Sequence, residues 1–320
     1  MARIIYGQYG SQVYGEVIDT VRHFGNRRSS RNGDTYDLPD LTIALESPLN
    51  ALPLGCGRKL KPAIAAAEAL QLIGAFTEPD WMCRIAPQFD RYREDVSVAQ
   101  SCTEPCLHSK TIRLFHGAYG MRIGSQLEHV IAKLNADVNT RQAVVTLWDT
   151  SLDNRPDHLD YPCTVALGFS VDDDDHLDMR VTMRSNDVWL GLPYDMFQFT
   201  QLQLSLCNVM GLLPGTYTHT AWSMHLYLHN IEESYDVTDV VAPHRTLPNV
   251  HGVGNRLLVD RNGAFTHMRD RARALALREL TDWTVSEAWY LDTLREYPID
   301  VAPDADSDGA GAGEAQPVQS

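Results

Sequence analysis

Side chains that can act as nucleophiles, anion binders or hydrogen-bond partners gather between Tyr161 and Asn230. A thiolate is a strong nucleophile, and a guanidinium can bind a phosphate bidentately while a hydroxyl donates to it. A histidine and a tyrosine two residues apart on a strand point to one face, which suits hydrogen bonds to a sugar hydroxyl. The set could therefore hold a phosphate, a sugar and a planar base beside a thiol. Its members are Cys163, Arg184, Ser185, Asp187, Asp195, His225 and Tyr227.

The flanking sequence predicts the elements that position these residues. Apolar and β-branched runs predict strands over 164–171 and 176–183, joined by an acidic turn, and a third strand over 215–228. A long, largely apolar stretch over 193–211 predicts the central core helix. We further expect helices over 11–25, 61–75 (with Pro62 in its first turn), 126–134, 281–297 and from 229, a strand over 141–149, a polar loop over 26–34 and irregular chain over 76–113.

Length and charge limit the class of protein. A chain of 320 residues can bury a sizeable core, and no linker divides it, so we expect a single domain over 1–301. The Gly/Ala/Asp/Ser-rich stretch 302–320 predicts a disordered tail. The net charge of −15 argues against a non-specific nucleic-acid binder. We expect no membrane partner, because no apolar run could cross a bilayer, and a cytoplasmic location, because the N-terminus lacks a secretory pattern.

The six cysteines are scattered, and in a reducing cytosol they are expected to be thiols. Cys102, Cys106 and His108 are spaced as in some metal sites, but no matching second pair follows them. We therefore predict no metal. Cys207 falls on the apolar face of an expected helix and is predicted to be a core residue.

The region around these residues resembles the thymidylate synthase family. That family has a cysteine after proline, then R-S-x-D-x-x-L-G-L-P, then H-x-Y, and all three motifs occur here in order at closely similar spacing. The resemblance covers roughly 11–235, with a weak zone at 76–113 that looks like an insertion. It implies an α/β (α+β) fold, a twisted mixed sheet flanked by helices. It also implies a homodimer packed sheet to sheet.

The resemblance assigns roles to individual residues. Cys163 matches the nucleophile that adds to C6 of a pyrimidine and so activates C5. Arg31, in the R-x-G pattern of 31–33, matches an arginine that closes over the nucleotide phosphate. Arg141 matches one of two arginines that reach the phosphate in the partner subunit, and the second of them is Gln142 here. The simpler alternatives are a buried strand cysteine and solvated surface arginines.

Three further roles come from the same resemblance. Glu68 matches a glutamate that organises proton transfer at the base, although a helical glutamate can equally face solvent. Tyr119, in a G-x-x-Y-G turn, would place a phenol near the nucleophile and the base, whereas most turn tyrosines are structural. Asp187 matches the residue that fixes the pterin ring of 5,10-methylenetetrahydrofolate, the implied co-substrate.

Asp195 departs from the synthases, which have asparagine after G-L-P-[FY]. Uracil offers an acceptor at O4 and a donor at N3, which an amide complements, whereas cytosine offers a donor at N4 and an acceptor at N3. An ionised aspartate accepts from N4, and a protonated one could also donate to N3. The simpler alternative is that Asp195 caps the helix that follows Pro193. Aspartate here is the pattern of the cytidylate hydroxymethylases, a branch of the same family.

The sequence therefore predicts a 5-hydroxymethylase acting on CMP or dCMP, with methylenetetrahydrofolate and water. The C-terminus lacks the apolar segment that closes over the folate in the synthases, which agrees with access of water. Two alternatives stay open: a thymidylate synthase that methylates dUMP, and a catalytically silent nucleotide-binding homologue. The sequence leaves open the choice between ribose and deoxyribose, and between phage DNA modification and a nucleoside natural-product pathway.

Overall fold

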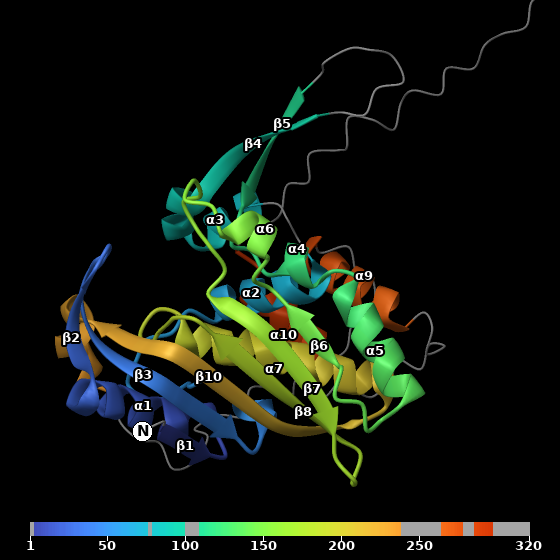
Figure 1. Ribbon diagram of the computed structural model, residues 1–320, viewed down its shortest axis with the longest axis horizontal. Coiled ribbons are helices and arrows are strands. Elements are labelled where there is room, and N and C mark those ends of the chain that lie inside the picture. Colours follow the sequence, from blue (N-terminus) through green and yellow to red (C-terminus); the bar gives the residue numbers. More distant parts are fainter. Residues whose placement is uncertain (1–2, 76–78, 100–108, 238–263, 278–284, 297–320) are drawn as a thin grey trace, which may run out of the picture.

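The computed structural model describes residues 3–75, 79–99, 109–237, 264–277 and 285–296. A mixed sheet runs through the molecule in the order β1-β3-β10-β8-β7-β6, while β2 pairs with β3 and β9 pairs with β10 (Figure 1). The β1–β3, β8–β10 and β9–β10 pairs are parallel and the others are antiparallel. These strands are β1 Arg3–Gly7, β2 Asn26–Ser30, β3 Gly33–Leu45, β6 Val144–Thr146, β7 Thr164–Val171, β8 His176–Met183, β9 Asn186–Asp187 and β10 Leu213–Tyr227.

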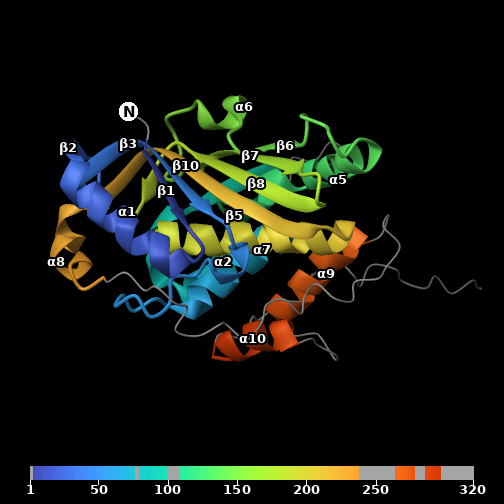
Figure 2. The ribbon, with the colours of Figure 1, turned by 90° about the horizontal axis from the view of Figure 1, so that it is seen from below.

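Helices cover one face of this sheet. Figure 2 shows α1 (Gly10–Phe24), α7 (Leu192–Met210) and α2 (Pro62–Gly74) on one side, with α9 (Ala264–Leu277) and α10 (Val285–Thr293) farther out. The alanines of α2 are buried, and their small size lets α2 pack closely on α7. Smaller elements connect these parts: η1 Pro48–Asn50, α4 Gly120–Ile123, α5 Gln126–Ala136, α6 Thr150–Asp153, η3 Leu228–Asn230 and α8 Ile231–Ser234.

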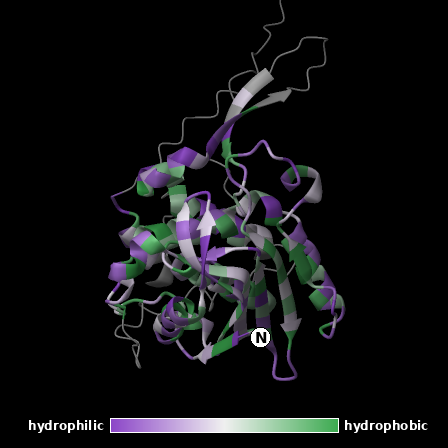
Figure 3. Cartoon of the chain, turned by 60° about the vertical axis from the view of Figure 1, so that its left-hand side comes forward, coloured by the Kyte–Doolittle hydropathy of each residue, from purple (hydrophilic) through white to green (hydrophobic). Residues whose placement is uncertain are grey.

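The predicted α/β fold, a twisted mixed sheet flanked by helices, is confirmed. The two strands predicted over 164–171 and 176–183 have those bounds as β7 and β8. The central helix is confirmed as α7, and it ends where Gly211 adopts a left-handed φ of 72°. Along the strands of the sheet, hydrophobic and hydrophilic residues both occur (Figure 3), as expected for strands of which one face packs on helices.

Several expectations were wrong in detail. The polar loop expected over 26–34 is instead a β-hairpin of β2 and the start of β3, which turns at Arg31 and Asn32, and Gly33 directly after the turn has a φ of 124°. The strand expected over 141–149 is only the three residues of β6. Of the helix expected over 281–297, α10 accounts for Val285–Thr293. The Cys102–Cys106–His108 pattern and the tail 302–320 lie outside the described residues.

The region 76–113 is not irregular where it is described. It forms α3 (Pro79–Ile85), the 3-10 helix η2 (Pro87–Tyr92) and an antiparallel ribbon of β4 (Arg93–Ala99) and β5 (Ser109–Phe115). The ribbon projects away from the main sheet (Figure 1). Among the described helices, none is both long and apolar enough to cross a membrane.

Candidate active site

A pocket of about 890 Å³ opens where the ends of β8, β9 and β10 meet α2 and the start of α7. The predicted residues come to it from distant parts of the sequence, and Arg141 is the one that does not line it. Arg141 is exposed and precedes β6. The pocket wall includes Arg31, Glu68, Tyr119, Cys163, Arg184, Ser185, Asp187, Asp195, His225 and Tyr227.

Cys163 lies directly before β7, where Arg184 holds its segment in place. The Arg184 backbone N–H donates to the Cys163 carbonyl (2.8 Å), and its guanidinium donates to the carbonyls of Pro162 (3.0 Å) and Tyr161 (3.2 Å). The same guanidinium is 3.8 Å from the Cys163 sulfur. Burial raises the pKa of the Cys163 thiol to about 11, and Arg184 only partly opposes this effect. Arg184 therefore lowers the pKa of this thiol, as a nearby guanidinium should, but the larger effect of burial makes the net shift upward.

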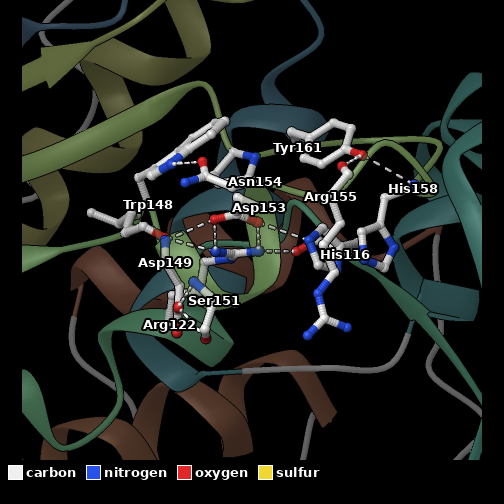
Figure 4. A network of polar contacts seen from close by, with 12 residues as sticks. His116, Arg122, Trp148, Asp149, Ser151, Asp153, Asn154, Arg155, His158 and Tyr161 are labelled. Atoms are coloured by element: carbon white, nitrogen blue, oxygen red, sulfur yellow. Dashed lines mark hydrogen bonds and ion pairs between the residues drawn. The ribbon is translucent and has the colours of Figure 1, made fainter.

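A network of polar contacts holds the residues that precede Cys163 (Figure 4). Arg122 donates to both carboxylate oxygens of Asp153 (2.6 and 2.9 Å), and His116 Nε2 lies 2.8 Å from Asp153 Oδ1. The His116 ring stacks on His158 at 3.5 Å between centroids, and the His158 backbone N–H donates to the Tyr161 hydroxyl at 3.1 Å. These contacts fix the chain immediately before Pro162 and Cys163.

The inner end of the pocket holds two carboxyl groups. Asp195, in the first turn of α7, accepts from Asn186 Nδ2 at 2.7 Å and from Gln198 Nε2 at 3.0 Å. Gln198 Nε2 also lies 3.3 Å from Glu68 Oε2. Glu68 therefore lines the pocket instead of facing solvent, and the hydrogen bonds to the Asp195 carboxylate come from side chains, not from the helix backbone.

Burial shifts the pKa of both carboxyl groups upward. It raises the pKa of Asp195 to about 7, against the opposing effect of the Asn186 and Gln198 amides. It also raises the pKa of Glu68 well above its usual value, and the charge of Asp195 adds to that rise. Burial likewise raises the pKa of Tyr119, whose ring stacks on Phe199 at 5.7 Å between centroids. Burial at the inner end of the site therefore favours the protonated forms of these acids.

The other end of the pocket carries hydroxyl, imidazole and guanidinium groups. His225 and Tyr227 alternate along β10 and both line the cavity, as the strand pattern predicts. Ser185 Oγ lies 3.5 Å from His225 Nδ1. Arg31 is exposed at the tip of the β2–β3 hairpin and also reaches the pocket wall. This end can bind an anion and the hydroxyl groups of a sugar.

Asp187 is held at a turn between these two ends. Its Oδ1 accepts the backbone N–H groups of Trp189 (2.8 Å) and Leu190 (3.0 Å). Burial raises its pKa. Arg58 lies nearby, with its guanidinium 4.6 Å from the Trp189 ring centroid and 2.9 Å from the Tyr14 hydroxyl.

Sequence reasoning missed several residues of this pocket. Gln198 could have been found, because it is three positions after Asp195 and so shares its helix face. Asn186 lies inside a recognised motif but at its variable position. No motif marks the cations or the residues of η2, which come from regions without a matched pattern. The missed residues include Arg58, Lys59, Lys61, Gln88, Phe89, Arg91, Tyr92, Asp160, Asn186, Tyr194 and Gln198.

The fold and the pocket define an α/β protein in which one cavity joins a cysteine, a pair of buried carboxyl groups and an arginine–serine pair. The model of the family described as thymidylate synthase matches residues 12–251. The chain belongs to the thymidylate synthase family.

Two relatives from phages are similar over most of this chain. A protein of Pseudomonas phage M6 named deoxyuridylate hydroxymethyltransferase is 25% identical over 247 residues, covering 75% of this chain and 66% of the relative. A protein of Bacillus phage SP01 with the same name is 23% identical over 239 residues, covering 69% of this chain and 58% of the relative. The chain thus matches less than two thirds of the length of each relative.

Proposed function

We propose that the protein is a cytidylate 5-hydroxymethylase, which transfers a one-carbon unit from 5,10-methylenetetrahydrofolate to C5 of CMP or dCMP. Water completes the hydroxymethyl group. The observation that carries this proposal is the buried carboxylate of Asp195 at the inner end of the pocket, 7% exposed and in contact with two amide donors. Membership of the thymidylate synthase family supports the reaction type, and Asp195 supports the base.

In this proposal Cys163 adds to C6 of the pyrimidine, and C5 then attacks the one-carbon unit. Arg184, 3.8 Å from the sulfur, stabilises the thiolate as it forms. Glu68, whose pKa burial raises well above its usual value, moves protons at the base, and the Tyr119 phenol lies in the same pocket wall. Arg31, Arg184 and Ser185 bind the phosphate, while His225 and Tyr227 bind the sugar.

Asp195 selects the base. Its carboxylate accepts a hydrogen bond from cytosine N4, and in its protonated form it also donates to N3. A pKa of about 7 makes both forms accessible near neutral pH. An ionised carboxylate repels the O4 acceptor of uracil, and a buried mismatch of this kind discriminates by orders of magnitude.

The pocket also fits the co-substrate. Asp187 offers a carboxylate to the N–H groups of a pterin, and Arg58, Lys59 and Lys61 line the same cavity, where they can bind the carboxylates of the folate glutamate. Methylenetetrahydrofolate supplies the one-carbon unit when bound. No group of three or more His, Cys, Asp or Glu side chains in the described part of the chain is arranged to bind a metal ion.

One observation favours a second candidate, hydroxymethylation of dUMP. Both phage relatives are named deoxyuridylate hydroxymethyltransferase. These names support hydroxymethyl transfer in both candidates, and the candidates differ only in the base.

The test is release of the C5 hydrogen from CMP, dCMP and dUMP in parallel, with methylenetetrahydrofolate and mass analysis of the products. We expect release from a cytidylate and a 5-hydroxymethyl product, and loss of both in Cys163→Ala. In Asp195→Asn we expect cytidylate turnover to fall by at least about 100-fold. Release from dUMP alone would contradict the choice of base, and dihydrofolate formation would indicate a synthase. Nucleotide binding without release would indicate a silent homologue.

A further inference from the structure

Three buried side chains form a carboxylate clamp, which we define as Asn186, Asp195 and Gln198. They are 3%, 7% and 6% exposed, respectively. Each oxygen of Asp195 accepts one amide N–H, at 2.7 Å from Asn186 and 3.0 Å from Gln198. Each bond fixes one oxygen, so the carboxylate can rotate only if both bonds break.

Gln198 extends the clamp to the second carboxyl group of the pocket. Its Nε2 atom lies 3.0 Å from Asp195 Oδ1 and 3.3 Å from Glu68 Oε2. An amide nitrogen has two N–H groups, so it can serve both carboxyl groups at once. Glu68 comes from α2 and the other two residues come from α7, and these helices pack together. The contact therefore depends on helix packing that the whole fold maintains.

A neutral donor is well suited to this position. Glu68 and Asp195 both contact Gln198 Nε2, and two ionised carboxylates at such a distance repel each other in a buried site. A cation between them would keep both ionised. An amide instead stabilises each oxygen by a hydrogen bond without cancelling a full charge. One carboxyl group can then stay protonated while the other accepts hydrogen bonds, as the proposed reaction needs for Glu68 and Asp195.

We propose that Gln198 is a positioning residue that orients the base-reading carboxylate of Asp195 and couples it to Glu68, and that it thereby sets the preference for cytosine over uracil. This inference rests on the proposed function. Two of the four lone-pair directions of Asp195 are taken by the clamp, which leaves the others for the base. Without Gln198 the carboxylate is held at one oxygen only and can turn toward either pyrimidine.

The test compares Gln198→Met with Gln198→Glu and a matched control, Gln201→Met. Methionine keeps the length of the side chain but has no donor, and glutamate keeps the shape but adds a third carboxyl group. Gln201 is on the same helix, is also buried, and accepts from Tyr290 away from the pocket (3.1 Å). Its substitution removes a buried hydrogen bond without altering the clamp.

We expect Gln198→Met to lower kcat/KM for the cytidylate about 10- to 100-fold. The ratio of kcat/KM for the cytidylate to kcat/KM for dUMP should fall by the same factor. The pH profile of kcat/KM should also shift upward by about 1 unit, because the lost donor stabilised the ionised carboxylate. Gln198→Glu should shift it further, and Gln201→Met should leave both the ratio and the profile unchanged.

The outcomes separate this inference from the proposed function. Wild-type protein without a cytidylate preference would overturn both. A wild-type preference that survives unchanged in Gln198→Met, with an unshifted pH profile, would overturn the role of Gln198 alone. If Gln198→Met fails to fold, as judged by its melting temperature, Gln198→Glu tests the inference instead, because it keeps the shape, removes the amide donor and should lower the cytidylate preference with a larger upward shift of the pH profile. Equal effects in Gln201→Met would show a structural role and also overturn the inference.

Discussion

At the scale of single residues, the pocket is defined by acids that burial keeps from ionising. Burial raises the pKa of Cys163 to about 11 and of Asp195 to about 7, and it raises that of Glu68 as well. A water-filled surface site would not do this, because solvent would stabilise each charge. The same desolvation strengthens the hydrogen bonds that a bound base makes to these groups. Ionisation of these buried groups is therefore costly for the fold.

That cost gives a stability prediction for Asp195→Asn. The folded pKa of about 7 exceeds the ordinary value of 3.8, so the folded state binds more protons between about pH 4 and 7. Asp195 therefore lowers the free energy of unfolding as pH rises through this window, by up to about 4 kcal/mol. The variant lacks this titration, so its stability relative to wild type should rise from pH 4 to 7 and level off above pH 8.

Urea unfolding of ligand-free protein at several pH values measures this difference. Asp34→Asn is the control, because Asp34 is partly exposed and its pKa is lowered by hydrogen bonds from Ser29 and Arg27. The free energy of unfolding of Asp34→Asn should not rise relative to that of wild type between about pH 4 and 7. Parallel stability curves for Asp195→Asn and wild type would contradict a buried, titrating Asp195.

At the scale of elements, the β2–β3 hairpin brings an exposed arginine to the pocket. Arg31 lies at the hairpin tip and lines the cavity. The hairpin passes close to Tyr227, because a Cβ atom placed on Gly33 would lie 3.9 Å from the Tyr227 ring. On the body of the same hairpin, Arg27 is paired with Asp34 at 2.8 Å. The hairpin thus presents its arginines in different settings: Arg31 lies at the pocket, whereas Arg27 and Arg28 are paired with Asp34 and Asp37 along the strands.

This contrast gives a prediction with a built-in control. Arg31→Ala should raise the KM for the nucleotide about 10-fold with little change in kcat, because it removes phosphate binding in ground state and transition state alike. Arg27→Ala should leave both constants near wild type, since it breaks only an exposed pair. Steady-state kinetics of the two variants measures these changes. An equal rise in KM for both variants would show that the hairpin acts only through its overall charge.

Sequence patterns predicted elements well where burial imposes a period. The strands 164–171 and 176–183 and the helix 193–211 have apolar patterns that only one packing satisfies. The hairpin over 26–34 was missed because β2 is exposed throughout and carries no apolar period. The region 76–113 was missed for a related reason: its prolines mark turns, but its ribbon β4–β5 is defined by pairing between its own strands.

The site shows the same division. Residues inside a recognisable motif were named from the sequence, and the fold brings them to one cavity with the exception of Arg141. Partners such as Gln198 and Asn186 act through hydrogen bonds to Asp195, and those bonds depend on rotamers and helix packing that spacing alone does not specify. The net upward shift of the Cys163 pKa depends on how deeply the thiol is buried, which the sequence does not specify.

At the scale of the whole molecule, the sheet face opposite α7 carries several exposed apolar side chains. Ile4 and Tyr6 of β1, Val144 of β6 and Trp222 of β10 are each at least half exposed. Strand register places Ile4 and Tyr6 in line with Thr220 and Thr218 of β10 across β3, on one face. Such a face suits the sheet-to-sheet homodimer that the sequence predicts. Arg141, exposed beside β6, would then extend toward the partner's pocket.

The dimer predicts recovery of activity when two inactive variants are mixed. In a heterodimer of Cys163→Ala and Arg141→Ala chains, one pocket has both defects, and the other keeps its own Cys163 and receives Arg141 from its partner. A statistical mixture should therefore regain about a quarter of wild-type sites. Cys163→Ala mixed with Arg184→Ala is the control: both residues belong to the pocket of their own chain, so no heterodimer contains an intact site. Differently tagged chains, refolded together and assayed for C5-hydrogen release, give the measurement. Equal recovery in the two mixtures, or none with Arg141→Ala once heterodimers are isolated, would place Arg141 outside the partner's site.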